Sequence, residues 1–247
     1  MRIFLDVGAH YGETLDVALN PKWGFHTVHC FEPASSLVYL LEKFHDKRVV
    51  IHPFGLAAES RDTILFGAGL LGASIYSQKK FLDSNSINVT EAIKLKKFSD
   101  WLLENTEQAD ELYLKMNCEG SEVDILENLI SSGLFSRISS IYVDFDIRKV
   151  PGQEYRQVLI EKKLDLLSVS LYTPDSLGLS GTMAVEKWLS LTLEEIEVDP
   201  LKQIVFNLGL YLPFYLHCRK IVFRFAPKIL IKMLVRKYGL HSKRNFK

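Results

Sequence analysis

The chain has 247 residues, of which 47% are hydrophobic and 24% are charged, and its formal net charge is zero. This length suits one domain with an extension, and the hydrophobic content excludes a disordered chain. The three cysteines are scattered and form no CxxC pair, so the composition indicates neither a zinc site nor a disulfide framework.

Hydrophobic runs and turn residues predict strands that alternate with helices along most of the chain. The predicted strands are Arg2–Val7, Thr27–Phe31, Val49–Phe54, Thr63–Phe66, Glu111–Met116, Ser140–Phe145, Leu164–Ser170 and Thr182–Trp188. The predicted helices are Gly12–Leu19, Ser35–Phe44, Leu95–Leu103, Ser121–Ile130 and Tyr155–Lys163. Such alternation implies right-handed crossovers and a mostly parallel sheet with helices on both faces. We therefore expect residues 1–200 to form an α/β, Rossmann-like domain.

The turn after the first strand, Gly8–Gly12, reads GAHYG and differs from the G-x-G-x-x-G pattern of dinucleotide sites. Asp6 ends the strand, where its charge would repel a pyrophosphate, and His10 stands where a second glycine would let a phosphate approach. The turn therefore suits a ligand with a positive group and little negative charge. S-adenosylmethionine meets this description, because it carries an ammonium, a sulfonium and no phosphate.

Two further strand ends carry carboxylates. Glu32 ends the second strand 20 residues after Gly12, which is the spacing at which a carboxylate accepts hydrogen bonds from ribose hydroxyls. The stretch KMNCEGSE, Lys115–Glu122, ends the predicted strand Glu111–Met116, which is the fourth when the hairpin strand Thr63–Phe66 is left out, and opens a helix. Each feature alone is explained by turn chemistry or by the preference of acids for helix N-termini. Their order at successive strand ends indicates a nucleotide-like cofactor at the carboxyl edge of the sheet.

Three motifs of the chain resemble those of the FkbM family of S-adenosylmethionine-dependent methyltransferases. The motifs are FLDVGAHYGE at Phe4–Glu13, CFEPASS at Cys30–Ser36 and LKMNCEGSEVDIL at Leu114–Leu126, and KLKKFSDWL at Lys94–Leu102 is similar to the helix that precedes the family's fourth strand. The resemblance covers residues 2–145. It implies a class I methyltransferase fold with seven strands, the last antiparallel, and methyl transfer to a hydroxyl of a sugar, glycolipid or natural product.

The resemblance also implies roles for single residues. The methionine end of the cofactor would be lined by Asp6, Gly8, Ala9, His10 and Gly12. The ribose would be held by Glu32, and the adenine would face the backbone around Gly55, Leu56 and Ala57. These expectations put one cofactor-binding site at the ends of the first three strands.

The fourth-strand motif departs from the family pattern. The family usually reads Lys-Ile-Asp-Val-Glu-Gly-Ala-Glu, whereas this chain has Asn117 in place of the aspartate. Asparagine forms hydrogen bonds but does not accept a proton at neutral pH. Two interpretations remain open. Either Glu119 or Glu122 is the general base and Asn117 orients substrate or cofactor, or the chain binds cofactor but transfers methyl poorly and serves as a partner or scaffold. Glu122 also suits the first turn of a helix without any catalytic role.

The acceptor side of the site is less defined. Asp144 and Asp146 close the predicted strand Ser140–Phe145, and Asp144 is a candidate for binding substrate hydroxyls of a small molecule, glycan or glycolipid. Ser74 lies on a long loop of the kind that often covers a substrate. The histidines show no metal-ligand spacing, so no metal is expected. An NAD(P)-dependent oxidoreductase is the competing enzyme class, and Asp6 disfavours it.

Charge divides the chain in two. Residues 1–200 hold 19 Lys and Arg against 30 Asp and Glu, whereas residues 201–247 hold 11 Lys and Arg and no acid. Basic side chains recur every four residues at Lys220, Arg224, Lys228, Lys232 and Arg236. This pattern predicts a basic amphipathic helical extension, which either binds an anionic membrane surface through residues 219–238 or packs on the acidic body. It lacks the context of a nucleic-acid-binding motif, so nucleic acid is not an expected partner.

The expected location is the cytoplasm, with peripheral attachment to the inner membrane face as an option. The N-terminus enters a strand directly and lacks the apolar region of a signal peptide. Scattered free cysteines fit a reducing compartment. The longest uncharged run of the extension, 203–218, has 16 residues and contains Pro213, so it is too short for a membrane span of ~20 residues.

Overall fold

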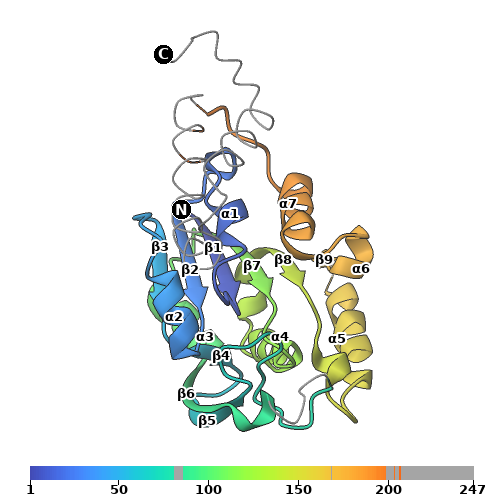
Figure 1. Ribbon diagram of the computed structural model, residues 1–247. Helices are drawn as coiled ribbons and strands as arrows, with labels where there is room; N and C mark the ends of the chain where they lie inside the picture. The colour runs from blue at the N-terminus through green and yellow to red at the C-terminus, as the bar shows by residue number, and fades with distance from the viewer. Residues whose placement is uncertain (81–85, 168, 199–202, 204–205, 207–247) are drawn as a thin grey trace, which may run out of the picture. The chain divides into compact units, whose positions relative to one another are not determined.

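The computed structural model describes residues 1–80, 86–167, 169–198, 203 and 206 (Figure 1). Apart from residue 206, these residues belong to one compact unit that runs from Met1 to Gln203. The expected basic extension, residues 201–247, lies outside the described residues except for Gln203 and Phe206, and so does its membrane-binding stretch 219–238.

A central sheet of six strands forms the middle layer of this unit, in the order β3-β2-β1-β7-β8-β9. Its strands are β1 Arg2–Val7, β2 Thr27–Phe31, β3 Val49–His52, β7 Glu111–Met116, β8 Ile138–Val143 and β9 Leu171–Tyr172. All neighbouring pairs are parallel. The strand order reverses between β1 and β7, and open α/β sheets bind ligands outside the carboxyl ends of the strands at such a point. The expected α/β arrangement with a mostly parallel sheet is confirmed, and it is compatible with a Rossmann-like fold.

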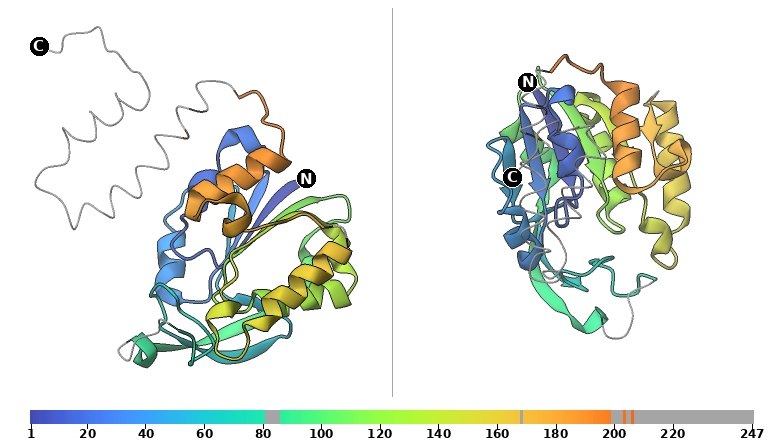
Figure 2. Two further views of the ribbon diagram at one scale, coloured as in Figure 1. Left: turned by 90° about the vertical axis from the view of Figure 1, so that its right-hand side faces the viewer. Right: turned by 45° about the horizontal axis from the view of Figure 1, so that its top comes forward.

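Helices cover both faces of this sheet (Figure 2). They are α1 Leu15–Ala18, α2 Ser35–Leu41, α3 Phe98–Asn105, α4 Glu122–Ser131, α5 Tyr155–Leu166, α6 Pro174–Leu177 and α7 Gly181–Thr192. On one face, Leu5 belongs to a core shared with Leu126 of α4 and Leu164 of α5. On the other face, Phe4 contacts Trp188 of α7. Successive residues of β1 point to opposite faces because the side-chain period of a strand is two.

A second sheet has three strands in the order β4-β6-β5. They are β4 Gly55–Ala57, β6 Thr90–Lys97 and β5 Arg61–Phe66, and β5 runs antiparallel to β6. The predicted strand Thr63–Phe66 is therefore confirmed as part of β5. The predicted helix Leu95–Leu103 starts too early, because Ile93 and Leu95 both point into the core of this sheet as strand residues, and α3 begins only at Phe98.

The predicted strand Thr182–Trp188 is wrong, because this segment lies within α7. Its buried residues Ala184, Val185 and Trp188 recur at helical spacing. The indole nitrogen of Trp188 donates a hydrogen bond to Ser140 Oγ at 2.8 Å, which anchors the helix to β8. Its β-branched and aromatic residues favour a strand by propensity, but here they form the face of a helix that packs on the sheet.

The predicted strand Leu164–Ser170 is also wrong, since α5 continues to Leu166 and β9 contains only Leu171–Tyr172. Within the described part of the chain the central sheet thus has six strands, and an antiparallel seventh is not found there. None of the helices described combines the length and the hydropathy that a membrane span requires.

Candidate functional site

A cavity of about 410 Å³ opens at the carboxyl ends of β1, β2 and β7. This volume lies within the range of ~300–1,000 Å³ that is typical of small-molecule sites. The cavity brings together most of the residues selected from the sequence. They are Gly8, His10, Glu32, Gly55, Leu56, Ser74, Asn117, Glu119 and Asp144. The other candidates, Asp6, Ala9, Gly12, Ala57 and Glu122, do not line it.

The walls of the cavity differ in chemistry. One side is apolar and is built largely by β2 and the second sheet, through Phe31, Leu37, Leu56, Leu65, Ile93 and Leu95. The remaining lining carries most of the charge. Of the described residues, four carboxylates and one ammonium line the cavity, namely Glu13, Glu32, Glu119, Asp144 and Lys115. The cavity is therefore apolar on one side and predominantly anionic on the other.

Gly8 lets the ends of β1 and β7 approach each other. Its φ is +78°, and a Cβ added there would lie 1.9 Å from the carbonyl oxygen of Asn117. The amide of Asn117 donates to the carbonyl oxygen of Val7 at 3.0 Å, which closes the two strand ends together. A side chain at this position would separate the strands, so the first glycine of GAHYG is needed for backbone contact. Gly12 has a packing role instead, against Phe44 and Leu41.

Asp6 lies behind the cavity rather than on its surface. It is fully buried, and Lys115 Nζ lies 2.8 Å from its Oδ1. Lys115 Nζ also donates to the carbonyl oxygen of Gly8 at 2.9 Å. Burial lowers the pKa of Lys115, but the Asp6 carboxylate raises it more, so the lysine stays protonated. The sequence-based expectation that Asp6 faces a cationic ligand is therefore corrected, because Lys115 takes that charge.

Glu32 sits where the sequence predicted it, at the end of β2 and on the cavity lining. Its Oε2 accepts the backbone N–H of His10 at 3.0 Å, and its Oε1 accepts that of Ala34 at 2.9 Å. Burial raises the pKa of Glu32, while these two backbone hydrogen bonds lower it. The carboxylate is held rigidly, and each oxygen keeps a second lone pair for a ligand hydroxyl.

His10 adopts the left-handed region, with φ of +52°. In the described part of the chain only Glu119, with φ of +60°, is another non-glycine residue with positive φ. Strained backbone of this kind often occurs at ligand sites. His10 Nδ1 lies 3.2 Å from Glu13 Oε1. Burial lowers the pKa of His10, but its hydrogen bond to Glu13 raises it and prevails. Glu13 is a site residue that sequence reasoning missed.

The turn after β7 holds the three candidates for the chemical step. Asn117 and Glu119 line the cavity, and the buried Oδ1 of Asn117 has no hydrogen-bond partner among the described residues. Glu122 does not line the cavity. Its Oε1 accepts the backbone N–H groups of Cys118 at 3.2 Å and Gly120 at 3.0 Å. Burial raises the pKa of Glu122 to about 7. These contacts make Glu122 the internal support of the turn.

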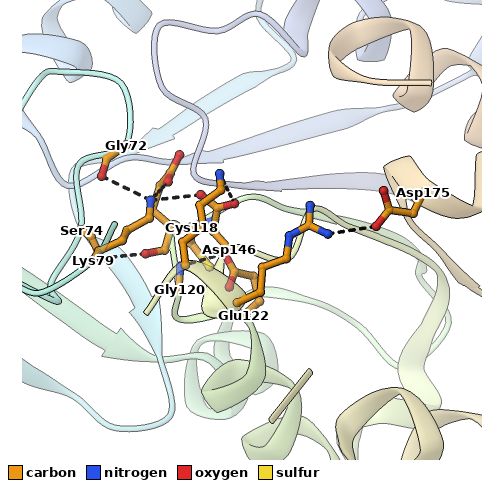
Figure 3. A network of polar contacts seen from close by, with 11 residues as sticks. Gly72, Ser74, Lys79, Cys118, Gly120, Glu122, Asp146 and Asp175 are labelled. Atoms are coloured by element: carbon orange, nitrogen blue, oxygen red, sulfur yellow. Dashed lines mark hydrogen bonds and ion pairs between the residues drawn. The ribbon is translucent and has the colours of Figure 1, made fainter. Parts of the chain in front are cut away.

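The loop after β5 forms part of the cavity wall through residues 70–75. Ser74 Oγ donates to the carbonyl oxygen of Glu119 at 2.7 Å, so its hydroxyl binds the turn rather than open solvent. Lys79, from the same loop, reaches Glu119 and Asp146 (Figure 3). The sequence gives no local signal for Lys79, because lysine is mostly exposed in proteins.

Other features of the site are also defined. Asp144 lines the cavity, and burial followed by the nearby Asp146 raises its pKa. Thr182 and Val185 of α7 line the cavity as well, although the sequence predicted a strand for this segment and no role in the site. In the part of the chain that the structure describes, no group of three His, Cys, Asp or Glu side chains is arranged to hold a metal ion.

Comparisons of the chain with protein-family models, with curated proteins and with solved structures find no match. What is known of the site is therefore its geometry and its charge. The cavity lies at the switch point of the sheet, it carries four carboxylates and one lysine among the described lining residues, and a fixed glutamate ends β2.

Proposed function

We propose that the chain is an S-adenosylmethionine-dependent methyltransferase that methylates a hydroxyl group of a sugar, glycolipid or natural product. The observation that carries the proposal is the anionic cavity at the carboxyl ends of β1, β2 and β7, with Glu32 on its lining. A site with several carboxylates favours a cationic ligand and repels a diphosphate. The resemblance of three sequence motifs to the FkbM family supports the same assignment.

The residues present fit this cofactor in three respects. The fixed carboxylate of Glu32 has free lone pairs for two ribose hydroxyls. The apolar side chains of Leu56 and Leu95 on the cavity wall suit a flat adenine ring. The unpartnered Oδ1 of Asn117 needs a donor, and the ammonium of the methionine group is one. Asp6 supports the site only through Lys115. When bound, S-adenosylmethionine supplies a methyl group on a positively charged sulfur.

Glu119 is the residue best suited to accept the proton of the acceptor hydroxyl. It lines the cavity, and its side chain is 23% exposed. Burial and the neighbouring Asp146 raise its pKa, while Lys79 lowers it. A carboxylate poised in this way is an effective general base, worth about 10²–10⁴-fold in rate. Asn117 cannot take the proton but can hold the hydroxyl in place.

The acceptor is expected on the side of the cavity formed by Glu119 and Asp144. The Asp144 carboxylate lines the cavity and is available to the hydroxyl groups of a glycan or glycolipid. Peripheral attachment to an anionic membrane through residues 219–238 remains a prediction. Flotation with anionic liposomes tests it, because the full chain should float and a chain ending at residue 203 should not. Equal flotation of both forms would contradict it.

A catalytically impaired, cofactor-binding partner protein is the second candidate, and Asn117 is the observation that favours it. The two candidates agree on cofactor binding and differ on methyl transfer. An NAD(P)-dependent oxidoreductase is the weaker alternative, because the first turn lacks G-x-G-x-x-G and carboxylates outnumber ammonium groups among the described lining residues.

Calorimetric titration with S-adenosylmethionine, and separately with NADH, tests the cofactor class. We expect S-adenosylmethionine to bind and Glu32→Ala to weaken binding by about tenfold or more, since a hydrogen bond to a charged group contributes ~1.5–3 kcal/mol. The exposed Glu42 gives the matched control, Glu42→Ala. Binding of NADH without S-adenosylmethionine would refute the proposal. Incubation with labelled cofactor and a lipid and glycan extract then separates an active enzyme from an impaired one.

A further inference from the structure

The ammonium of Lys79 is one of the most buried charges outside the sheet. Its side chain is 2% exposed, although it belongs to the loop that follows β5. The ammonium contacts the Oε2 of Glu119, lies 3.0 Å from Asp146 Oδ2 and lies 3.4 Å from the carbonyl oxygen of Gly72 (Figure 3). The loop thus inserts a cation between the turn after β7 and the segment after β8.

The charges around Lys79 explain why it can be buried. Removing an ammonium from water costs several kcal/mol unless it is paired and hydrogen-bonded. Two carboxylates share this ammonium, and Lys149 Nζ lies 2.5 Å from the other oxygen of Asp146. The charge of Glu119 also helps to raise the pKa of His10. Lys79 contacts both acids at once. A solvent-exposed lysine elsewhere on the loop could not replace it, because its ammonium would not reach both carboxylates.

Three further hydrogen bonds attach the same loop to the same part of the fold. Ser74 Oγ donates to the carbonyl oxygen of Glu119 at 2.7 Å. Tyr76 OH lies 3.0 Å from Asp124 Oδ2 in α4. The backbone N–H of Lys80 donates to the carbonyl oxygen of Lys149 at 2.8 Å. Residues 70–75 of the loop line the cavity, so these bonds hold one cavity wall against the Glu119 turn.

We propose that Lys79 is a positioning residue that fixes the Glu119 carboxylate at the cavity and holds residues 70–80 against the acceptor side. The catalytic part of this role rests on the proposed methyl transfer with Glu119 as the base. The structural part does not, because the ion pairs form in the chain by itself. Lys79 thereby couples the position of residues 70–80 at the cavity wall to the charge of Glu119, the proposed proton acceptor.

Hydrogen exchange of the full chain without cofactor tests the structural part. In Lys79→Met we expect exchange of the amides in residues 72–80 to rise by about tenfold or more, because the segment loses its buried anchor. Lys79→Arg keeps the charge and should retain most of the protection. The control is Lys80→Met, since Lys80 is exposed and its side chain makes only a 3.5 Å ion pair with Glu154. Unchanged protection in Lys79→Met would overturn the proposal.

The pH dependence of methyl transfer tests the catalytic part. Lys79 lowers the pKa of Glu119, so its removal should move the acidic limb of the activity profile upwards by about 1 pH unit. Lys79→Arg should restore the limb, and Lys80→Met should leave it in place. An unmoved limb in Lys79→Met would exclude Lys79 from positioning Glu119.

The two measurements separate failure of this inference from failure of the proposed function. If Lys79→Met loses protection and no variant transfers methyl, the anchoring role of Lys79 is supported and the proposed methyltransferase activity is refuted. If Lys79→Met does not fold, Glu119→Gln removes one partner only, and it should raise exchange in the same segment. Unchanged exchange in Glu119→Gln would then overturn the anchor.

Discussion

Asp6 and Lys115 are direct register partners on the adjacent parallel strands β1 and β7, and their charged atoms lie 2.8 Å apart. The pair joins the two halves of the sheet at the switch point. Lys115 lines the cavity and Asp6 lies behind it. The positive charge of Lys115 therefore balances the negative charge of Asp6, although more than a hundred residues separate them in the chain.

Removal of Lys115 should destabilise the fold strongly. Lys115→Met leaves the fully buried Asp6 without a counter-ion, and breaking a buried pair in this way costs about 3–5 kcal/mol. The double variant Asp6→Asn, Lys115→Met should recover at least half of that loss, because no uncompensated charge remains. Urea unfolding of both single variants and the double variant gives the coupling energy. Additive losses would show that the pair is not the source of the effect.

Gly8→Ala should destabilise the protein far more than an alanine at a glycine with the same φ. Gly8 and Gly152 both have φ of +78°, but an added Cβ meets Asn117 at 1.9 Å in the first case and nothing within 4 Å in the second. Gly152→Ala should cost about 1 kcal/mol from backbone conformation alone. Gly8→Ala should cost about 1–3 kcal/mol more from overpacking. Equal thermal stability of the two variants would contradict the close approach of β1 and β7.

The stability of the protein should depend on pH through His29 and His52. Their rings are stacked, with Nδ1 of His29 2.9 Å from Nε2 of His52. Burial lowers the pKa of each to about 4. The folded state therefore binds fewer protons than the unfolded state between pH 4 and the ordinary value near 6.5. The stabilisation is complete above pH 6.5 and is lost as the pH falls through about 4.

Replacement of both histidines isolates this contribution. His29→Phe, His52→Phe should flatten the stability curve between pH 6.5 and 4 by about 1–2 kcal/mol, after allowance for the partial exposure of the rings. Urea midpoints measured at pH 7.5, 6, 5 and 4 for both proteins give the difference. Parallel curves would show that the two histidines titrate normally in the folded state.

Glu122→Gln separates the two candidate bases. Burial raises the pKa of Glu122 from 4.5 to about 7, so the wild-type protein loses stability as the pH rises through this window. The loss is of the order of 3 kcal/mol, and a neutral glutamine should abolish it. Glutamine Oε1 still accepts from Cys118 and Gly120, so the turn should persist.

The same variant tests catalysis. If Glu119 is the base, Glu122→Gln should retain methyl transfer and be more stable than the wild type at pH 7.5. Glu119→Gln, as the comparison, should lose about 10²-fold or more in rate. Loss of activity in a well-folded Glu122→Gln would transfer the role of base to Glu122.

The predicted strands Arg2–Val7, Thr27–Phe31 and Glu111–Met116 agree with β1, β2 and β7 to the residue. They are short, mostly apolar runs that are followed by glycine, glutamate or asparagine, and strands buried on both faces are largely apolar in this way. The prediction of a strand at Thr182–Trp188 is wrong because the apolar residues of a seven-residue segment fit either the period of two of a strand or the period of 3.6 of a helix. Contact with Ser140 and the sheet face decides that it is a helix.

The candidate site was predictable mainly where residues end strands, whereas of the loop after β5 only Ser74 was selected from the sequence. Glu32, Asn117 and Glu119 meet in one cavity because parallel strands end at the same edge. Lys79 comes from a loop whose path depends on Glu119 and Asp146 together, so no local pattern identifies it. Pairing of Asp6 with Lys115 follows from strand register, which the sequence alone does not set.

The position of β7 between β1 and β8 has a consequence for biosynthesis. Arg2 pairs with Glu111 in the finished sheet, so β1 leaves the ribosome long before its neighbour exists. Until then the nascent chain displays an apolar strand with one free edge, which is a site for aggregation. We expect chains truncated before residue 111 to need chaperones. The arrival of β7 covers the free edge of β1, and β8, β9 and α7 then complete the sheet and the cavity.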